Sequence, residues 1–563
     1  ASIMINNVDI NEELTKEEIL DKKAQARFLR AYFYWLLLRR YGPVPLIPDE
    51  TISIDETYIG MSCPRATYDE VVDYIDKEMI LAANDLPDRR DRQNIARATK
   101  GAALAVRAKV LLYSASPLNN PLPNDPDKFT DFVDDQGRIL MSQTYDESKW
   151  AKAAAACKDV MELNVYKLYT TGINTVNTGA FPATIAPPHH DVYSNEDFPN
   201  GWANIDPYES YRALFNGTVS SVDNPELIFT RGQNIGGERI KDMVIHQLPS
   251  VAKGWNTHGM TQKQVDAYYM NTGDDCPGMN SQYAGYQAYK DRVDNRPRPV
   301  GYTSNAQDYK PLSANVSLQY ANREPRFYAS VAFNGARWYL GNESQQANQN
   351  KQVFYYRGGG NGYSNNMFWL RTGIGVMKYV NPSDTYENSD GAKIIDKDEP
   401  AIRYADILLM YAEALNELTT SYEVSSWDGI KAYTINRDPE EMRKGIKPVR
   451  MRAGVPDYDT PIYDNPAKFR IKLKRERQIE LFAEGKRYYD LRRWKDAELE
   501  ESVPVYGCYT FMTESQKDLF HTPVPISNLS ATFSSKMYFW PIKHDELKRN
   551  KRLTQNPGWT YND

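Results

Sequence analysis

The sequence lacks a long apolar run, a cysteine framework and an excess of charge of either sign. Apolar stretches such as Tyr32 to Leu38 fall far short of the roughly 18 residues that a membrane-spanning helix needs. The four cysteines are too few and too scattered for a disulfide-framed fold, and none forms a CxxC pair. The 68 basic and 74 acidic residues give a net charge of −6. This argues against a general nucleic-acid binder, because such proteins carry a basic footprint.

Motifs for catalysis and metal binding are missing as well. No phosphate loop, HExxH, GxSxG or cysteine-rich metal spacing occurs in the chain. The densest group of metal-ligating residues, His189-His190-Asp191, is better interpreted as an ordinary loop. Paired carboxylates for glycoside hydrolysis stay open, because 74 acidic residues permit many pairings and nothing singles out one of them. We therefore predict a protein that is not an enzyme and has no catalytic residue, metal ligand or cofactor.

Helical periodicity is strong near both ends of the chain. Phe28, Ala31 and Trp35 lie on one apolar stripe, which ends before Gly42. Alanines crowd two of the later helices, and small residues let helix axes approach closely, as in antiparallel helix pairs stacked side by side. The helices predicted from these patterns run over about residues 28–41, 67–86, 99–116, 146–163, 404–415 and 466–494, the last one broken near Gly485.

The middle of the chain is rich in Asn, Gly, Tyr, Ser and Pro. It contains strand-like pieces at 327–333 and 353–356 and a Gly-Gly-Gly loop at 358–360. We predict a mainly α-helical fold in which degenerate helix pairs form a scaffold and a loop-rich insert with short strands presents a binding surface. The predicted parts of this one compact body are an N-terminal scaffold (1–165), a ligand-binding insert (166–400) and a C-terminal scaffold (401–563).

A basic run from Arg470 to Arg493 invites a nucleic-acid interpretation. Acidic residues such as Glu476, Glu480 and Glu484 are interleaved with it, several at helix-neighbour spacing from the bases. A structural helix with many salt bridges is therefore the better interpretation.

Aromatic residues in the loops are the most informative feature for function. The chain has 40 Tyr, 10 Trp and 18 Phe, so much of its aromatic surface carries a polar group. Sugar rings offer an apolar face of C–H groups and a fringe of hydroxyls. Exposed Trp and Tyr rings cover the first, while Asn, Asp, Gln and Arg pair with the second. The alternative is that each ring simply packs beneath a long loop.

Several short sequence segments then point to a family. The chain resembles the SusD/RagB-like family of outer-membrane nutrient-binding lipoproteins, in segments that follow the order this family uses. These segments are ARFLRAY (26–32), YGPVPL (41–46), RATKGAA (97–103), TQ with VDAY (261–268), NREPRFY (322–328), RYAD (403–406), YAEALNE (411–417), RER (475–477), FAEGKRYYDLRRW (482–494) and LTQNPGW (553–559).

The resemblance implies four degenerate tetratricopeptide-like helix pairs. It also implies a lid over a SusC-like TonB-dependent transporter at the outward-facing surface of the outer membrane. Such a protein captures oligosaccharides and delivers them without cleavage. Members of the family carry a lipidated cysteine ahead of the ARFLRAY helix, so attachment by a lipid anchor outside the visible start of this chain is inferred from resemblance alone.

The ligand-binding residues are predicted from chemistry and location, because binding sites vary in this family. The resemblance directs attention to loops at about 51–65, 275–292 and 338–371. Cys63 and Cys276 lie in two of these loops, where either a disulfide or an apolar wall is permitted. The predicted ligand-binding residues are Tyr58, Tyr283, Tyr286, Tyr289, Trp338, Asn361, Trp369 and Arg371.

Three alternatives to glycan capture stay open. The first is an oligopeptide-capturing lid of a peptide-importing transporter, the second is a glycoside hydrolase, and the third is a purely structural lid that binds no ligand. A structural calcium is a further open question, because Asp274 and Asp275 offer oxygen ligands, although a solvated turn is favoured.

Overall fold

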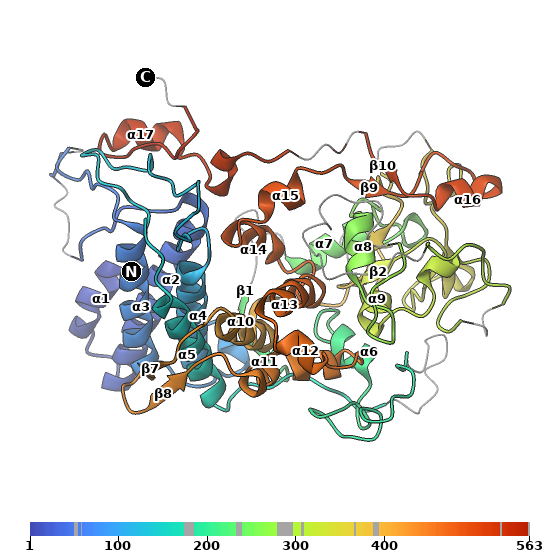
Figure 1. Cartoon of the computed structure of the whole chain (residues 1–563), viewed down its shortest axis with the longest axis horizontal. Coiled ribbons are helices and arrows are strands. Elements are labelled where there is room, and N and C mark those ends of the chain that lie inside the picture. Colours follow the sequence, from blue (N-terminus) through green and yellow to red (C-terminus); the bar gives the residue numbers. More distant parts are fainter. Residues whose placement is uncertain are drawn as a thin grey trace.

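The fold is mainly α-helical, as predicted, with helices at both ends of the chain and a loop-rich middle (Figure 1). The computed structural model describes residues 1–49, 55–57, 59–173, 185–231, 239–278, 297–305, 309–364, 368–386, 393–527, 529 and 532–560. The N-terminal helices are α1 (Ser2–Asn7), α2 (Lys16–Tyr41), α3 (Tyr68–Asp85), α4 (Lys100–Ala115) and α5 (Ser148–Glu162).

Local capping explains where these helices begin and end. Thr15 caps α2 by accepting a hydrogen bond from the Glu18 backbone N–H, and the Glu18 carboxylate accepts one from Thr15 N–H in return. Thr99 caps α4, as its position predicted, by accepting from Ala102 N–H at 3.1 Å. At its C-terminal end α2 stops at Gly42, whose φ of +69° is a backbone conformation that glycine adopts without strain.

Successive helices pack side by side. Each of α2, α3 and α4 packs against the next helix, α5 packs against α10 (Tyr404–Asn416), and α10 packs against α11 (Pro439–Arg452). The alanines of α4 and α5 are buried in these contacts. At the closest approach, a Cβ added to Gly445 of α11 would lie 2.5 Å from the Leu408 carbonyl oxygen of α10. Small side chains therefore let the scaffold helices come together, as the sequence predicted.

The insert contains short helices and strands. Among the described residues, ten strands form five two-stranded antiparallel sheets, which pair β1 with β6, β2 with β5, β3 with β4, β7 with β8 and β9 with β10. Elements of the insert are α6 (Pro207–Arg212), β1 (Leu227–Arg231), α7 (Ile240–Gln247), α8 (Gln262–Ala267), α9 (Pro325–Ser330), β2 (Val331–Ala332), β3 (Ala336–Trp338), β4 (Lys351–Val353), β5 (Gly375–Val376) and β6 (Glu399–Arg403).

Several C-terminal helices, among them α10 and α11, lie between the N-terminal helices and the insert in Figure 1. Helix α13 contributes Phe469 and Leu473 to a hydrophobic core shared with α2–α5 and α10, whereas its Ile479 belongs to a second core within the insert. The remaining elements are β7 (Tyr422–Ser425), β8 (Ala432–Ile435), α12 (Thr460–Tyr463), α13 (Pro466–Glu480), α14 (Arg487–Arg493), α15 (Ala497–Glu501), β9 (Tyr506–Gly507), α16 (Lys517–Phe520), β10 (Val524–Pro525) and α17 (His544–Arg549). The domain boundaries at 165 and 400 stay predictions.

Two local predictions meet different outcomes. The long helix over 466–494 is broken as predicted, because Ala483 and Gly485 both have positive φ between α13 and α14. The strand-like piece at 327–333 is wrong in part, since residues up to Ser330 belong to helix α9 and only Val331 and Ala332 form a strand. Pro325 occupies the first turn of α9, where its fixed φ favours a helix start.

Two further features concern the cysteines and the apolar character of the helices. All four cysteines carry free thiols, so Cys63 and Cys276 are not joined, and Cys276 is buried. Within the described part of the chain, no helix combines the length and the apolar character that spanning a membrane would require.

Candidate ligand-binding surface

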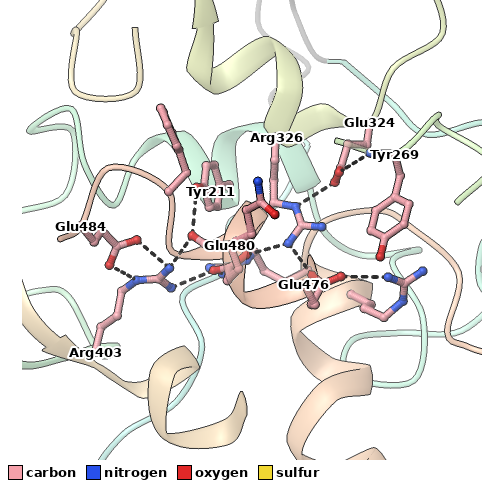
Figure 2. A network of polar contacts seen from close by, with 12 residues as sticks. Tyr211, Tyr269, Glu324, Arg326, Arg403, Glu476, Glu480 and Glu484 are labelled. Carbon is pink, nitrogen blue, oxygen red and sulfur yellow. Dashed lines mark hydrogen bonds and ion pairs between the residues drawn. The ribbon is translucent and has the colours of Figure 1, made fainter. Parts of the chain in front are cut away.

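A buried ion network joins the insert to the C-terminal helices, and charged residues from four of the family-like segments take part in it (Figure 2). Arg403, at the start of α10, donates to Glu226 at 2.6 Å, to Glu480 at 2.8 Å and to Glu484 at 2.8 Å. Arg326 of α9 donates to Glu476 at 2.6 Å and also to Glu480, at 2.9 Å. These side chains have almost no solvent exposure, so the network holds elements together and offers no group to a ligand.

Charges within the network are matched. Burial alone would raise the pKa of the Glu480 carboxyl, but Arg452, Arg403 and Arg326 together hold it well below its ordinary value. The basic run predicted as a salt-bridged helix behaves in the same way. Arg477 pairs with Asp490 at 3.0 Å and Arg470 with Glu417 at 2.6 Å. A basic face for nucleic acid is therefore not formed by these residues.

Metal-ligating residues do not converge in the part of the chain that the structure describes. No group of three or more His, Cys, Asp or Glu side chains there could hold a metal ion. His189 and Asp191 lie 3.6 Å apart on an open surface, with 69% and 100% of their side chains exposed. Asp275 pairs with Arg475, and Asp274 accepts from the Thr272 hydroxyl at 2.8 Å.

The predicted ligand-binding residues fall into two sets. Tyr58, Tyr283, Tyr286 and Tyr289 lie outside the described residues. The other four, Trp338, Asn361, Trp369 and Arg371, are described, and each has a defined environment.

Trp338 lies at the end of β3 with only 2% of its surface exposed. It lines a cavity of about 70 Å³ together with Tyr208, Tyr339 and Arg212. Ligand pockets usually measure roughly 300–1,000 Å³. The cavity beside Trp338 is therefore too small for a sugar ring, and the indole has no open face for stacking.

Trp369 and Arg371, both predicted to bind ligand, lie in contact with each other. The Arg371 guanidinium lies 4.3 Å from the centre of the indole ring, and the Tyr363 ring lies 4.9 Å away. Phe511 packs on the same indole at 6.0 Å. Trp369 is only 6% exposed, whereas Phe511 is 45% exposed and its neighbour in sequence Tyr509 is 39% exposed. We name Tyr363, Trp369, Arg371, Tyr509 and Phe511 the Trp369 cluster.

Asn361 connects two loops. Its backbone carbonyl accepts from the Asn256 side-chain amide at 2.7 Å, and its own side chain accepts from Val251 N–H at 3.4 Å. Asn361 therefore holds the loop after α7 against the Gly-Gly-Gly loop.

A wider groove runs along α2. It encloses about 600 Å³ and its lining is mainly apolar, including Phe33 and Leu37. Its charged members already have partners, since Arg30 pairs with Glu78 and Lys543 with Asp545. The groove thus offers few free polar groups to the hydroxyls of a sugar.

Comparisons with known proteins identify the family. The model of the SusD family matches residues 225–559, which is 335 of 563 residues. The chain belongs to the SusD family. A second model, described as starch-binding and associating with the outer membrane, matches residues 1–112 of this SusD-family chain. The resemblance seen in the sequence is therefore confirmed.

Individual relatives are distant. SusD-like protein P25 from Formosa agariphila is 26% identical over 110 residues, which is 20% of this chain and 20% of that protein. The chain thus matches about a fifth of the length of this curated relative. Among solved structures, BT4246 has 23% identity and a TM-score of 0.73, covering 99% of this chain and 88% of its own. A SusD-like protein from Bacteroides fragilis has 21% identity and a TM-score of 0.65, covering 99% and 83%. At these identities the structures support the fold.

Several exposed rings of this SusD-family chain escaped the sequence analysis. Besides Tyr509 and Phe511, these are Trp255 and Phe368, which stack on each other with ring centres 5.7 Å apart. A weak signal was present, because Tyr509 and Phe511 alternate in a strand-like stretch and Trp255 stands between Gly254 and Asn256. Exposed rings from three separate segments therefore gather around the loop that ends at Arg371, an arrangement suited to stacking on apolar faces of a ligand.

Proposed function

We propose that the chain is a cell-surface glycan-binding protein that captures oligosaccharides and delivers them to a SusC-like TonB-dependent transporter. Membership of the SusD family supports this proposal, as does the match of residues 1–112 to a model described as starch-binding and associating with the outer membrane. The protein would sit on the outward face of the outer membrane, held by a lipid anchor.

The observation that carries the proposal is the Trp369 cluster. Phe511 and Tyr509 expose aromatic rings next to each other, and grouped exposed apolar surface of this kind marks ligand or partner sites. The C–H face of a sugar can stack on these rings while its hydroxyls accept hydrogen bonds from the partly exposed Arg371 guanidinium. Because sugars lose well-solvated hydroxyl interactions on binding, we expect modest affinity for oligosaccharides and little for monosaccharides.

We further propose that capture proceeds without cleavage. A glycosidase needs two carboxylates facing each other across roughly 5–10 Å. Around the Trp369 cluster the ring contacts involve Tyr363, Phe511 and Tyr509, and the charged group on the indole is a guanidinium. This composition favours binding over hydrolysis.

The test is native affinity electrophoresis of the purified chain in gels that contain different polysaccharides. We expect one polysaccharide family to retard the wild-type chain and Phe511→Ala to reduce that retardation. Trp540→Ala is the matched control, because Trp540 is an exposed aromatic residue outside the Trp369 cluster, with 40% exposure. Reducing-end assays on the same polysaccharides should detect no new ends.

Other outcomes would decide against the proposal. Wild-type mobility that no glycan changes, with peptides co-purifying, would favour an oligopeptide-capturing lid. Tight pairing with a transporter but no ligand of either class would favour a structural lid. New reducing ends would favour a glycosidase.

A further inference from the structure

Trp255 and Phe368 form a second exposed aromatic pair, and the ring contacts of this pair differ from those of the Trp369 cluster. Trp255 is 41% exposed and Phe368 is 44% exposed, and their rings stack at 5.7 Å with planes 29° apart. The His246 ring packs edge-on against the Trp255 indole at 4.5 Å. Phe368 directly precedes Trp369, so consecutive residues contribute rings to two different groups.

The loop that carries Trp255 is conformationally constrained on both sides of the indole. Lys253 and Asn256 have φ values of +59° and +51°, in the left-handed region that non-glycine residues rarely adopt. Between them, a Cβ on Gly254 would lie 2.3 Å from Leu248 Cβ, so only glycine fits there. Backbone strain of this kind persists where the surrounding structure enforces it, and it clusters at functional sites.

Hydrogen bonds fix the same loop against α7 and the Gly-Gly-Gly loop. Trp255 N–H donates to the Ile245 carbonyl at 2.8 Å, and Asn256 N–H donates to the Leu248 carbonyl at 3.0 Å. The Asn256 side chain, 1% exposed, donates to the Asn361 carbonyl at 2.7 Å. The backbone that carries the exposed indole is thus fixed by these hydrogen bonds, which lowers the entropic cost of stacking a ligand on the ring.

Polar groups flank the pair. The His246 and His258 rings are stacked with centres 5.0 Å apart, and His246 Nδ1 lies 3.0 Å from the Thr257 hydroxyl. Burial, followed by the charge of His246, lowers the pKa of His258. A neutral imidazole has one N–H donor and one acceptor nitrogen, which suits the hydroxyls of a sugar.

We propose that Trp255 and Phe368 form a second stacking surface for the glycan, distinct from the Trp369 cluster, with His246 packed against Trp255 and His258 stacked on His246. The proposal rests on the glycan-binding function proposed above and adds a dependence of affinity on the length of the oligosaccharide. An oligosaccharide long enough to reach from the Trp369 cluster to Trp255 gains a second contact, whereas a shorter one does not. Affinity should therefore rise with chain length in a step that depends on Trp255.

The test uses calorimetric titration with size-fractionated oligosaccharides of whichever polysaccharide retards the wild-type chain. We expect Trp255→Ala and Phe368→Ala to weaken binding of long oligosaccharides by roughly three- to tenfold, the range expected for one aromatic contact. Binding of the shortest oligosaccharides should be unchanged. Trp255→Phe keeps a ring at the site and should retain most of the affinity. Trp540→Ala, which removes an equally exposed indole elsewhere, should behave as wild type, and thermal unfolding should show that all variants fold.

The outcomes separate the two proposals. Unchanged binding of long oligosaccharides by a folded Trp255→Ala chain would overturn the second surface and leave glycan capture intact. An equal loss at every chain length would also overturn it, because Trp255 would then belong to the first site. If the wild-type chain binds no glycan, the proposed function itself fails and the second surface falls with it.

Discussion

Arg403 and Glu484 form a two-pronged ion pair, with Arg403 Nε donating to Glu484 Oε2 at 2.8 Å and Nη2 donating to Oε1 at 2.9 Å. The two residues are 81 positions apart, and their side chains are almost completely inaccessible to solvent. Arg403 ends β6 and begins α10, whereas Glu484 follows α13. The pair therefore joins the insert to the C-terminal helices by an ion pair that is shielded from solvent.

Arg403→Ala should destabilise the protein strongly. Removing the guanidinium leaves Glu226, Glu480 and Glu484 buried with fewer partners, and breaking a buried ion pair on one side costs about 3–5 kcal/mol. The free energy of unfolding from urea titration at neutral pH measures the effect.

The exposed pair Arg231–Glu399 supplies the control. It joins the strands β1 and β6 near Arg403, but the Arg231 side chain is 57% exposed. Arg231→Ala should cost less than about 1 kcal/mol, because solvent screens such pairs. Equal losses for the two variants would show that burial of the network does not govern its contribution.

His521 should make the protein sensitive to acid. It is buried, and its Nε2 lies 3.3 Å from the side-chain nitrogen of Asn334. The side-chain oxygen of Asn334 accepts a hydrogen bond from Tyr355 N–H at 2.7 Å. Nε2 therefore faces a donor and has to remain unprotonated. Burial, as the main cause, lowers the pKa of His521 to about 4.

The sign of the pH effect follows from that pKa. Between the ordinary value of 6.5 and about 4, the unfolded chain binds a proton that the folded chain does not, so stability falls as the pH falls through this window. From pH 7 to pH 4 the loss assigned to this group is about 3 kcal/mol. In urea titrations at both pH values, the loss of stability between pH 7 and pH 4 should be smaller for His521→Gln than for wild type, and the difference should be about 3 kcal/mol. His189→Gln, which alters an exposed histidine, should match wild type; the same pH dependence in all three chains would remove His521 as the cause.

Gly445→Ala should destabilise the contact between α10 and α11. Alanine improves helix propensity by about 1 kcal/mol over glycine. Against this, its Cβ would lie 2.5 Å from the Leu408 carbonyl oxygen and 2.9 Å from Ala412 Cβ, and overpacking of this kind costs about 1–3 kcal/mol. We expect a lower melting temperature. A Cβ added to Gly360 would meet no atom within 4 Å, so Gly360→Ala should leave the melting temperature unchanged. A stabilised Gly445→Ala chain would show that the helices separate freely.

The scaffold could be predicted from the sequence because its signals are local. Apolar stripes mark α2, α3, α4 and α10, and a threonine cap begins each of the first three. A buried stripe recurs every three or four residues whatever the rest of the chain does. The break between α13 and α14 was also visible, because Gly485 lies where the chain needs a positive φ.

The candidate surface could be predicted only in part. In loops there is no period that tells an exposed ring from a buried one, so Trp338 and Trp369 carried the same signal in the sequence as Trp255 and Phe368. Tertiary packing decides: Arg371, Tyr363 and Phe511 cover Trp369, whereas Trp255 is held at the surface by backbone contacts. The predicted strand at 327–333 was wrong in part for a related reason. Its residues are buried on all sides, and a short, fully buried apolar run suits a helix such as α9 as well as a strand.

Trp369 and Phe511 should separate stability from binding. Trp369 is 6% exposed and packed on three sides, so Trp369→Ala should cost about 3–5 kcal/mol of folding free energy, as large aromatic truncations in cores do. Phe511 is 45% exposed, so Phe511→Ala should cost less than half as much, because most of its apolar surface already faces water. In glycan titrations the order should reverse for chains that are still folded, with Phe511→Ala losing more affinity than Trp369→Ala although it loses less stability. If Phe511→Ala binds glycan as wild type does while Trp369→Ala unfolds, the Trp369 cluster is part of the core and the ligand must bind elsewhere.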